Sequence, residues 1–186
     1  ENAKIEILKR QEEHKTEFDE EYIEKAAKNI GYGAVKYYDL RQNRISQYKF
    51  GFKLILDNKG NTAVYLLYSY VNMCSIFNKA KMSKDDISKL IQNEKFKITN
   101  KKERELLLCL FKLNDVLDEI LVDLNLNRLT DYVYAIAVKF NELYTDNSCH
   151  IIGNEHTNSR LLLIELTKKF FELSFQLLGL EPIEKI

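Results

Sequence analysis

Apolar residues recur at the spacing of an α-helix over most of the chain, and this periodicity constrains the fold more than any other feature. Between Lys101 and Leu124 they form one broad stripe, made of Leu106, Leu107, Leu110, Leu113, Leu117, Ile120 and Leu121. Such a stripe is the buried face of an amphipathic helix. Further helices are predicted over residues 62–79, 83–93, 130–144 and 158–178. Four long helices and a short one predict an all-α helix bundle.

The first forty residues carry weaker helical patterns. Residues 3–13 and 17–29 predict two charged helices, and residues 34–41 can continue the second helix past the glycines. Each of these helices places a few apolar residues among many charges, so the pattern predicts helices that are only partly buried.

The segment before the bundle interrupts the helical pattern. Residues 42–52 are polar and aromatic and contain no proline. Tyr48, Phe50 and Phe52 alternate with other residues, which predicts one short strand. Residues 57–60 (Asp-Asn-Lys-Gly) predict a turn.

The length of 186 residues suits one domain with a small extension, and the 45% of hydrophobic residues suffice for a core. We predict a mostly helical connector or stem over residues 1–57 and a helical domain over residues 58–186. The chain begins Glu1-Asn-Ala-Lys, which is neither a signal peptide nor an initiator methionine. We therefore expect a piece of a larger protein.

The composition excludes several classes of function. Lys and Arg number 28 and Asp and Glu number 28, so bulk charge alone cannot hold a nucleic acid. An RNA-binding surface that uses ring stacking and a local basic stripe remains open. Cys74, Cys109 and Cys149 are widely spaced and odd in number, which predicts free thiols in a reducing compartment. No apolar run is long enough for a transmembrane helix, so we expect no membrane partner.

A pair of tyrosines stands at the start of the first bundle helix. Gly60 frees the backbone, Asn61 can cap, and a helix follows from Thr62. Tyr65 and Tyr68 are three residues apart and share a helix face. Two such rings can stack on nucleobases and hydrogen-bond to their edges. From the spacing alone, packing in the core is the more common role of such rings.

The run from Lys36 to Tyr70 resembles the start of the anticodon-binding domain, often called DALR, of cytosolic-type arginyl-tRNA synthetases. Asp131-Tyr-Val-Tyr-Ala-Ile-Ala-Val-Lys-Phe-Asn-Glu-Leu-Tyr144 resembles the next-to-last long helix of that family. Ser159-Arg-Leu-Leu-Leu-Ile-Glu and the ending Leu177-Leu-Gly-Leu-Glu-Pro-Ile-Glu-Lys-Ile resemble its last helix and tail. The resemblance covers residues 31–186.

The resemblance implies which side chains contact the anticodon. It assigns Tyr65 and Tyr68 to the anticodon-reading face and Tyr144 to an aromatic contact at a helix end. The set of expected anticodon-contacting residues is Tyr65, Tyr68, Asn72, Tyr144, His150 and Ile186. Asn72 lies one turn beyond Tyr68 and can contact a base edge, although a solvated amide is the more common role of such a residue. His150 is the only ring in the loop where relatives carry an aromatic residue, and Ile186 stands where the family commonly ends in methionine.

The resemblance also implies contacts from the stem. This region joins the catalytic and anticodon domains in class I synthetases and touches the inner side of the tRNA. Arg44 and Lys49 are therefore expected phosphate contacts. A salt bridge between domains explains the same residues.

As a whole, a protein of this family uses ATP with Mg²⁺ to activate arginine as its adenylate and transfers it to its tRNA. The expected partners are the anticodon stem-loop of an arginine tRNA and a catalytic domain on the same chain, in the cytoplasm, with no DNA partner. The alternative is a non-catalytic helical module that binds protein, and residues 1–29 could also form an oligomerisation hairpin.

Catalytic and metal sites are not expected in this chain. Lys81-Met-Ser-Lys84 matches the ATP-phosphate loop of class I synthetases, but it lies between two predicted helices and no His-x-Gly-His motif accompanies it. Ser83 suits a helix cap better. Cys149, His150 and His156 fit no usual zinc spacing and lack a fourth ligand. No cofactor is therefore predicted for the chain itself.

Overall fold

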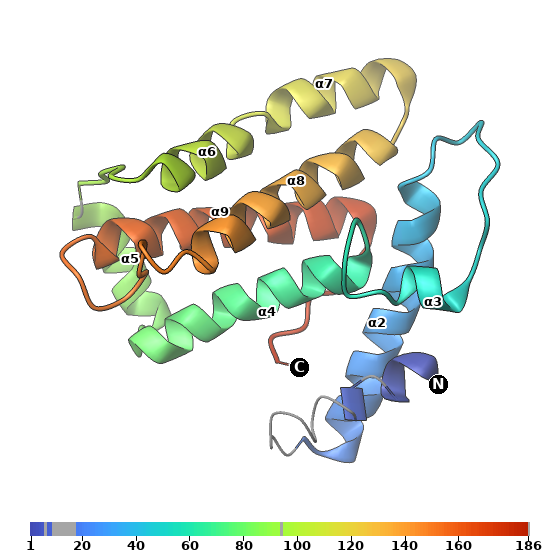
Figure 1. The fold of residues 1–186 in the computed structure, drawn as a ribbon, viewed down its shortest axis with the longest axis horizontal. Coiled ribbons are helices and arrows are strands. Elements are labelled where there is room, and N and C mark those ends of the chain that lie inside the picture. The colour runs from blue at the N-terminus through green and yellow to red at the C-terminus, as the bar shows by residue number, and fades with distance from the viewer. Residues whose placement is uncertain (6, 9–17, 94, 186) are drawn as a thin grey trace.

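The computed structural model describes residues 1–5, 7–8, 18–93 and 95–185. In these ranges the chain is helical except for its connecting loops, and they contain no strand (Figure 1). Residues 2–5 and 7–8 are helical at the N-terminus, and most of the rest of the helix predicted over residues 3–13 lies outside the described residues. The all-α prediction is confirmed.

Eight helices follow residue 18 in the described part of the chain. They are α2 (Glu20–Leu40), α3 (Phe52–Ile55), α4 (Ala63–Ala80), α5 (Lys84–Asn93), α6 (Lys101–Leu110), α7 (Leu113–Asp123), α8 (Asn127–Tyr144) and α9 (Thr157–Leu178). The long helices α4, α8 and α9 lie side by side, and α6 and α7 cover one flank of this group (Figure 1). The predicted helix bundle is therefore present.

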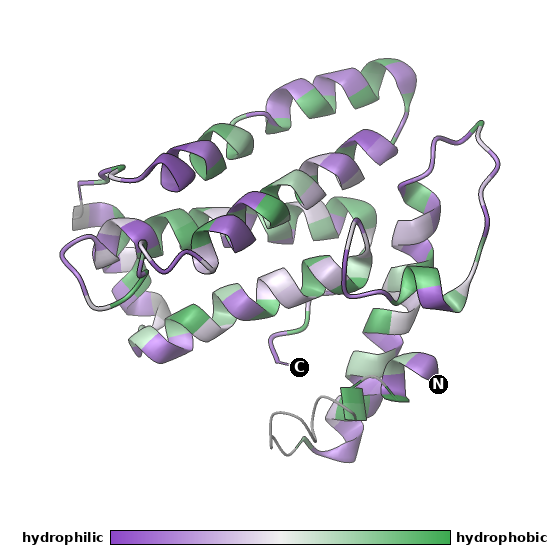
Figure 2. Cartoon of the chain, viewed as in Figure 1, coloured by the Kyte–Doolittle hydropathy of each residue, from purple (hydrophilic) through white to green (hydrophobic). Residues whose placement is uncertain are grey.

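Helix α8 is the centre of the bundle. It packs against α4, α6, α7, α9 and the C-terminal part of α2. Its inward side chains Val133, Ile136, Ala137, Phe140 and Leu143 are fully buried. Apolar and polar residues alternate along the bundle helices in the manner of amphipathic helices (Figure 2). None of the helices in the described ranges is long and apolar enough to cross a membrane.

The strand predicted from Tyr48, Phe50 and Phe52 is wrong. Residues 47–51 are irregular, and Phe52 begins the short helix α3. The rings pack edge to face instead. The ring centre of Tyr38 lies 5.6 Å from that of Tyr48 and 6.3 Å from that of Phe50. The ring centres of Phe50 and Phe52 are 5.6 Å apart. Because a strand needs a partner for its backbone groups and none is at hand, the local alternation produces an aromatic cluster and not a sheet.

The helix predicted over residues 101–124 is two helices. Helix α6 ends before Phe111, and α7 starts after Lys112, whose N–H bonds to the Cys109 carbonyl. The Phe111 ring is 67% exposed at this break. Leu110 and Leu113 are both buried on either side of it. The apolar stripe therefore continues across the break, which explains why the periodicity did not reveal it.

Helix caps show both successes and errors of the sequence analysis. Thr62, and not Asn61, caps α4, because its Oγ accepts the Tyr65 N–H at 3.1 Å. Ser83 caps α5 as predicted, with its Oγ accepting the Asp86 N–H at 3.1 Å. The helix predicted over residues 130–144 begins three residues earlier, at Asn127, so Thr130 is not its cap. The buried Thr130 hydroxyl donates to the Asn127 carbonyl instead.

Helix α2 runs through both of its glycines to Leu40, as predicted, and Tyr37 attaches it to the bundle. The Tyr37 hydroxyl lies 2.5 Å from Oδ1 of Asn61 and 2.9 Å from the Thr130 carbonyl. Asn61 donates to Asp131 at 3.0 Å, and Arg41 donates to the Asn61 carbonyl. Burial, with the charge of Asp131 nearby, raises the pKa of Tyr37. This network joins α2, the loop before α4, and α8.

The C-terminal tail folds back over α2. Gly179 ends α9 at φ 62°, a left-handed conformation that suits glycine. Leu180 and Ile183 are buried, and the Tyr22 hydroxyl donates to the Lys185 carbonyl at 2.6 Å. The tail therefore covers part of the contact between α2 and the bundle.

Candidate nucleic-acid interface

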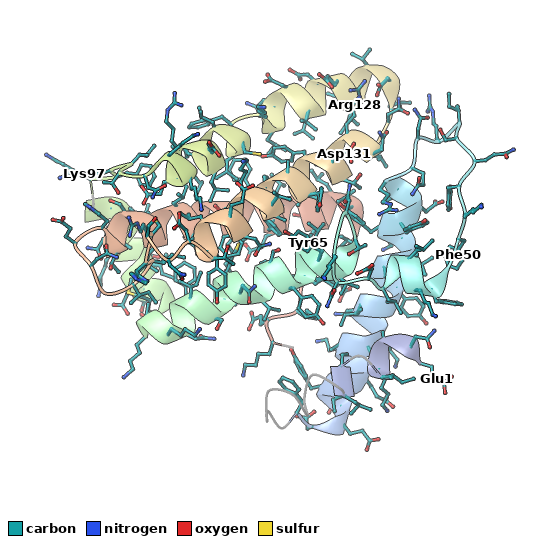
Figure 3. The ribbon with its side chains drawn as sticks, viewed as in Figure 1. Glu1, Phe50, Tyr65, Lys97, Arg128 and Asp131 are labelled. Carbon is teal, nitrogen blue, oxygen red and sulfur yellow. The ribbon has the colours of Figure 1, made fainter. Side chains whose placement is uncertain are left out.

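Four residues line the contact between α4 and α8, and we call them the α4–α8 seam: Tyr65, Ser69, Tyr134 and Asn141. Tyr65 and Tyr134 meet edge to face, with ring centres 5.5 Å apart. Both rings are half-buried, so each keeps part of its surface open to solvent. Figure 3 places Tyr65 between the two helices. An aromatic pair of this kind offers a fixed apolar surface with polar edges.

A polar contact fixes this pair. The Asn141 amide nitrogen donates to the Tyr65 hydroxyl and to the Ser69 hydroxyl, each at 2.9 Å. The Ser69 hydroxyl donates to the Tyr65 backbone carbonyl at 3.0 Å. The Tyr65 ring is therefore held both by Tyr134 and by a hydrogen bond at its hydroxyl.

The helices α4 and α8 run in the same direction (Figure 1). Asn72 lies one turn beyond Ser69, and Tyr144 lies one turn beyond Asn141. Because Ser69 and Asn141 are hydrogen-bonded, this register places Asn72 and Tyr144 at the same end of the seam. Both side chains are half-buried.

The tyrosines of α4 fall into two groups. Tyr65 and Tyr68 are half-buried, whereas Tyr70 is 3% exposed and donates its hydroxyl proton to Glu172 at 2.7 Å. Burial together with this hydrogen bond raises the pKa of Tyr70. Tyr68 has further contacts of its own. Of the three tyrosines of α4, Tyr70 is thus the core residue, whereas Tyr65 and Tyr68 lie at the surface of the bundle.

Tyr144 is the last residue of α8. Its ring stacks on Phe140 at a centre-to-centre distance of 5.7 Å and an interplanar angle of 17°. Phe140 is fully buried and fixed in the core. One side of the Tyr144 ring therefore rests on a rigid support at the start of the 145–156 loop.

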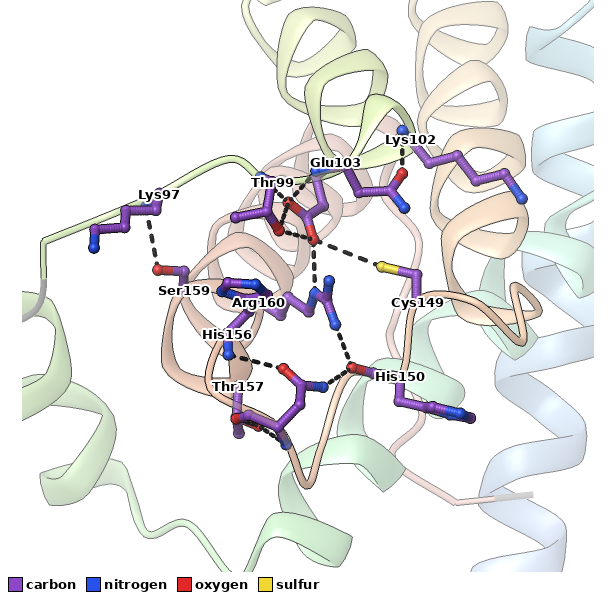
Figure 4. A network of polar contacts seen from close by, with 12 residues as sticks. Lys97, Thr99, Lys102, Glu103, Cys149, His150, His156, Thr157, Ser159 and Arg160 are labelled. Carbon is purple, nitrogen blue, oxygen red and sulfur yellow. Dashed lines mark hydrogen bonds and ion pairs between the residues drawn. The ribbon is translucent and has the colours of Figure 1, made fainter.

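A buried ion pair holds the loop that carries His150 (Figure 4). Arg160 lies 2.6 Å from Glu103, and its Nη1 donates to the His150 carbonyl at 2.6 Å. The His150 side chain is exposed, so its backbone serves the structure and its ring remains available. Burial raises the pKa of the Cys149 thiol, which lies 3.6 Å from Glu103. Within the described ranges no cluster of residues could hold a metal ion.

Arg44 and Lys49 lie in the loop between α2 and α3, at the end of the molecule where α7 turns into α8. Arg44 lines a cleft of about 250 Å³, and Asn125 lines the same cleft from the α7–α8 corner. The Lys49 carbonyl accepts the Tyr38 hydroxyl at 2.9 Å, and both basic side chains are exposed. They are separate from the α4–α8 seam.

Ile186 and residues 81–84 are the remaining positions singled out from the sequence. Ile186 lies outside the described residues. Lys81 ends α4 at φ 53°, and Ser83 caps the next helix, so residues 81–84 form a corner between two helices. Sequence reasoning missed Tyr134 and Asn141. Their spacing of seven residues puts them on one face of α8, and this was the available signal.

Comparison with known families identifies two segments. Residues 66–186 match the DALR anticodon binding domain, and residues 1–52 match the catalytic domain of class I (R) tRNA synthetases. The arginine–tRNA ligase, chloroplastic/mitochondrial, of Arabidopsis thaliana is 38% identical over 170 residues, which are 91% of this chain and 26% of that protein. The arginine–tRNA ligase of Trichodesmium erythraeum is 37% identical over 186 residues, 99% of this chain and 31% of that protein.

Solved structures show the same arrangement. The arginyl-tRNA synthetase of Plasmodium falciparum has a TM-score of 0.86 at 36% identity, over 100% of this chain and 32% of that one. The arginyl-tRNA synthetase of Thermus thermophilus shares the fold, with a TM-score of 0.79 at 20% identity, over 100% of this chain and 30% of that one. The chain thus spans between a quarter and a third of the length of these proteins. With most of its length matched to one family model, this chain belongs to the DALR anticodon-binding domain family of arginyl-tRNA synthetases.

Proposed function

We propose that this chain is the part of an arginine–tRNA ligase that binds the anticodon stem-loop of an arginine tRNA. The whole enzyme activates arginine with ATP and Mg²⁺ and transfers it to the terminal ribose of the tRNA in the cytoplasm. We place the boundary between the connector and the anticodon-binding domain near residues 57 and 58. The catalytic domain precedes the bundle on the same polypeptide.

The observation that carries the proposal is the α4–α8 seam, a pre-organised aromatic surface. Three of its four residues lie in the segment matched to the anticodon-binding family, and Tyr65 directly precedes that segment. Sequence-specific recognition of RNA needs unstacked bases, and rings replace the lost stacking by about 1–3 kcal/mol per base. Tyr65, Tyr68 and Tyr144 supply rings that are held by the bundle yet partly open to solvent.

Polar groups for base edges and phosphates are also present. By the register of the two helices, Asn72 is at the same end of the seam as Tyr144, and the exposed ring of His150 follows in the next loop. We propose that the exposed side chains of Arg44 and Lys49 contact phosphates of the stem from a separate loop. Ile186 is the remaining proposed contact. Because the net charge is zero, stacking and base edges supply most of the affinity.

Binding of two RNAs tests the proposal. The 186-residue chain is titrated with a labelled anticodon stem-loop of an arginine tRNA and with a copy whose middle cytosine is changed. Arginine codons share a central guanine, so the middle cytosine is the natural discriminating base. We expect tighter binding of the cytosine form. Equal binding of the two RNAs would contradict anticodon reading and favour the alternative, a helical module that binds protein.

A second measurement tests whether this chain alone has catalytic activity. The chain alone should not release pyrophosphate from ATP and arginine, because residues 81–84 form a helix corner. Pyrophosphate release by a pure preparation would contradict this interpretation. Tyr65→Ala should remain folded and lose RNA binding, whereas a purely structural role of that ring predicts a lowered melting temperature.

A further inference from the structure

We propose that Asn141 is a positioning residue that turns the Tyr65 hydroxyl into a hydrogen-bond donor toward the nucleobase. This inference rests on the proposed function and names the direction of one contact within it. Asn141 does not need to touch RNA for this role. It acts by occupying the acceptor side of the Tyr65 oxygen from within the bundle.

Ser69 determines how the amide of Asn141 is oriented. Its side chain is 1% exposed, and its only hydroxyl proton is donated to the Tyr65 carbonyl at 3.0 Å. The Ser69 oxygen can then only accept a hydrogen bond from Asn141, 2.9 Å away. The amide group of Asn141 must therefore turn its nitrogen, and not its oxygen, toward α4.

The second proton of that amide determines the state of Tyr65. An amide nitrogen carries two protons, and Asn141 points one at Ser69 and the other at the Tyr65 hydroxyl, also at 2.9 Å. The Tyr65 oxygen is consequently an acceptor within the protein. In the described ranges no protein group accepts the Tyr65 hydroxyl proton. That proton is left for a ligand.

The direction of the Tyr65 hydroxyl determines which base edges it prefers. A hydroxyl that can only donate outward favours a base edge with an acceptor, such as N3 or O2 of cytosine, over one that presents an N–H. The edge-to-face contact with Tyr134 restricts rotation of the Tyr65 ring and so helps to keep its hydroxyl in the seam. The seam thereby supplies both a stacking surface and one hydrogen bond of fixed direction.

A double-mutant cycle tests this with the 186-residue chain and the arginine anticodon stem-loop. Tyr65→Phe keeps the ring and removes the donor, and we expect binding to weaken about 2- to 10-fold, the usual effect of one hydrogen bond. Asn141→Asp keeps the shape of the side chain but offers only acceptor atoms. The Tyr65 hydroxyl then donates its hydrogen bond to this carboxylate, inside the bundle. We expect Asn141→Asp to weaken binding at least as much as Tyr65→Phe.

The decisive result is the non-additivity of the two changes. In the Asn141→Asp background, Tyr65→Phe should cost less than about 2-fold, because the donor is already lost. Repulsion between the new carboxylate and RNA phosphates adds equally to both arms of the cycle and cancels. A neutral variant, Asn141→Ala, leaves the hydroxyl free to turn outward, so Tyr65→Phe should keep its full effect there. Melting temperatures of all variants show whether binding losses merely follow stability.

Four results would overturn the proposal. If Asn141→Asp binds RNA as well as the unmodified chain, the amide has the opposite orientation. If Tyr65→Phe costs the same in both backgrounds, the hydroxyl direction does not depend on Asn141. If Tyr65→Phe alone costs nothing while the chain still prefers the cytosine stem-loop, anticodon binding stands and the inference fails. If the unmodified chain shows no preference between the two stem-loops, the proposed function fails and the inference with it.

Discussion

Arg160 and Glu103 form a buried ion pair that connects α9 to the start of α6. The Nε atom of Arg160 lies 2.6 Å from Oε1 of Glu103, and the two side chains are only 8% and 3% exposed. The second carboxylate oxygen accepts the backbone N–H groups of Thr99 and Asn100 at 2.7 and 3.1 Å. One carboxylate therefore caps a helix and pairs with a charge from another helix.

Replacing Glu103 by alanine should destabilise the protein strongly. The change leaves the Arg160 guanidinium buried without its partner, which costs about 3–5 kcal/mol. Urea denaturation of both proteins measures the difference in the free energy of unfolding. Glu105→Ala is the matched control, because Glu105 is on the same helix but forms its ion pairs with Lys101 and Lys139 near solvent. Equal losses for the two variants would contradict a special role of the buried pair.

The same carboxylate should make stability depend on pH. Burial alone would raise the pKa of Glu103, but hydrogen bonds from Thr99, Arg160 and Asn100 outweigh it and hold the pKa below its ordinary value of 4.5. A lowered pKa contributes stability that is fully present above the ordinary value and is lost as the pH falls through the folded value. We therefore expect the stability difference between the unmodified protein and Glu103→Gln to be constant from about pH 7 to pH 5 and to shrink below about pH 4. A difference that grows in acid would contradict this assignment.

Tyr37→Phe should loosen the attachment of α2 to the bundle. The Tyr37 side chain is fully buried, and without its hydroxyl the Thr130 carbonyl loses a buried hydrogen-bond partner. We expect a loss of about 1–3 kcal/mol in the free energy of unfolding. Tyr32→Phe is the control, since Tyr32 is on the same helix and 73% exposed. If both changes have the same small effect, the hydroxyl of Tyr37 does not hold the two parts together.

The sequence predicts the helices well where periodicity and end signals agree. The last helix was expected over residues 158–178 and lies at Thr157–Leu178, and Gly179 ends it in a left-handed conformation. The break at Phe111 was missed because the buried stripe continues across it on both sides. The strand at Tyr48 was wrong because alternation is a local property, whereas a strand depends on a distant partner.

The candidate site was predictable only in part. Tyr65 and Tyr144 could be named from the resemblance to a family, and the structure places them along the contact between α4 and α8. Asn141 could not be found in this way, because its contacts with Tyr65 and Ser69 join residues that are 76 and 72 positions apart in the chain. One sequence alone does not show which faces of two helices meet.

We expect a base of the anticodon stem-loop to stack on the ring of Tyr144. Its position on the fixed Phe140 ring leaves it little freedom, so a base that stacks on it loses little additional entropy in the protein. Tyr144→Ala should weaken binding of the arginine anticodon stem-loop by an amount equivalent to about 1–3 kcal/mol. Tyr144→Phe keeps the stacking surface and should retain most of the affinity.

Tyr32→Ala serves as the control for Tyr144→Ala, because it removes an exposed ring from α2, away from the α4–α8 seam. Fluorescence anisotropy at two salt concentrations separates stacking from charge, since stacking losses persist at higher salt whereas phosphate contacts weaken. Circular dichroism shows whether each variant keeps its helices. If Tyr144→Ala binds as tightly as the unmodified chain while Tyr65→Ala does not, the RNA contacts end at the seam and do not extend to the end of α8.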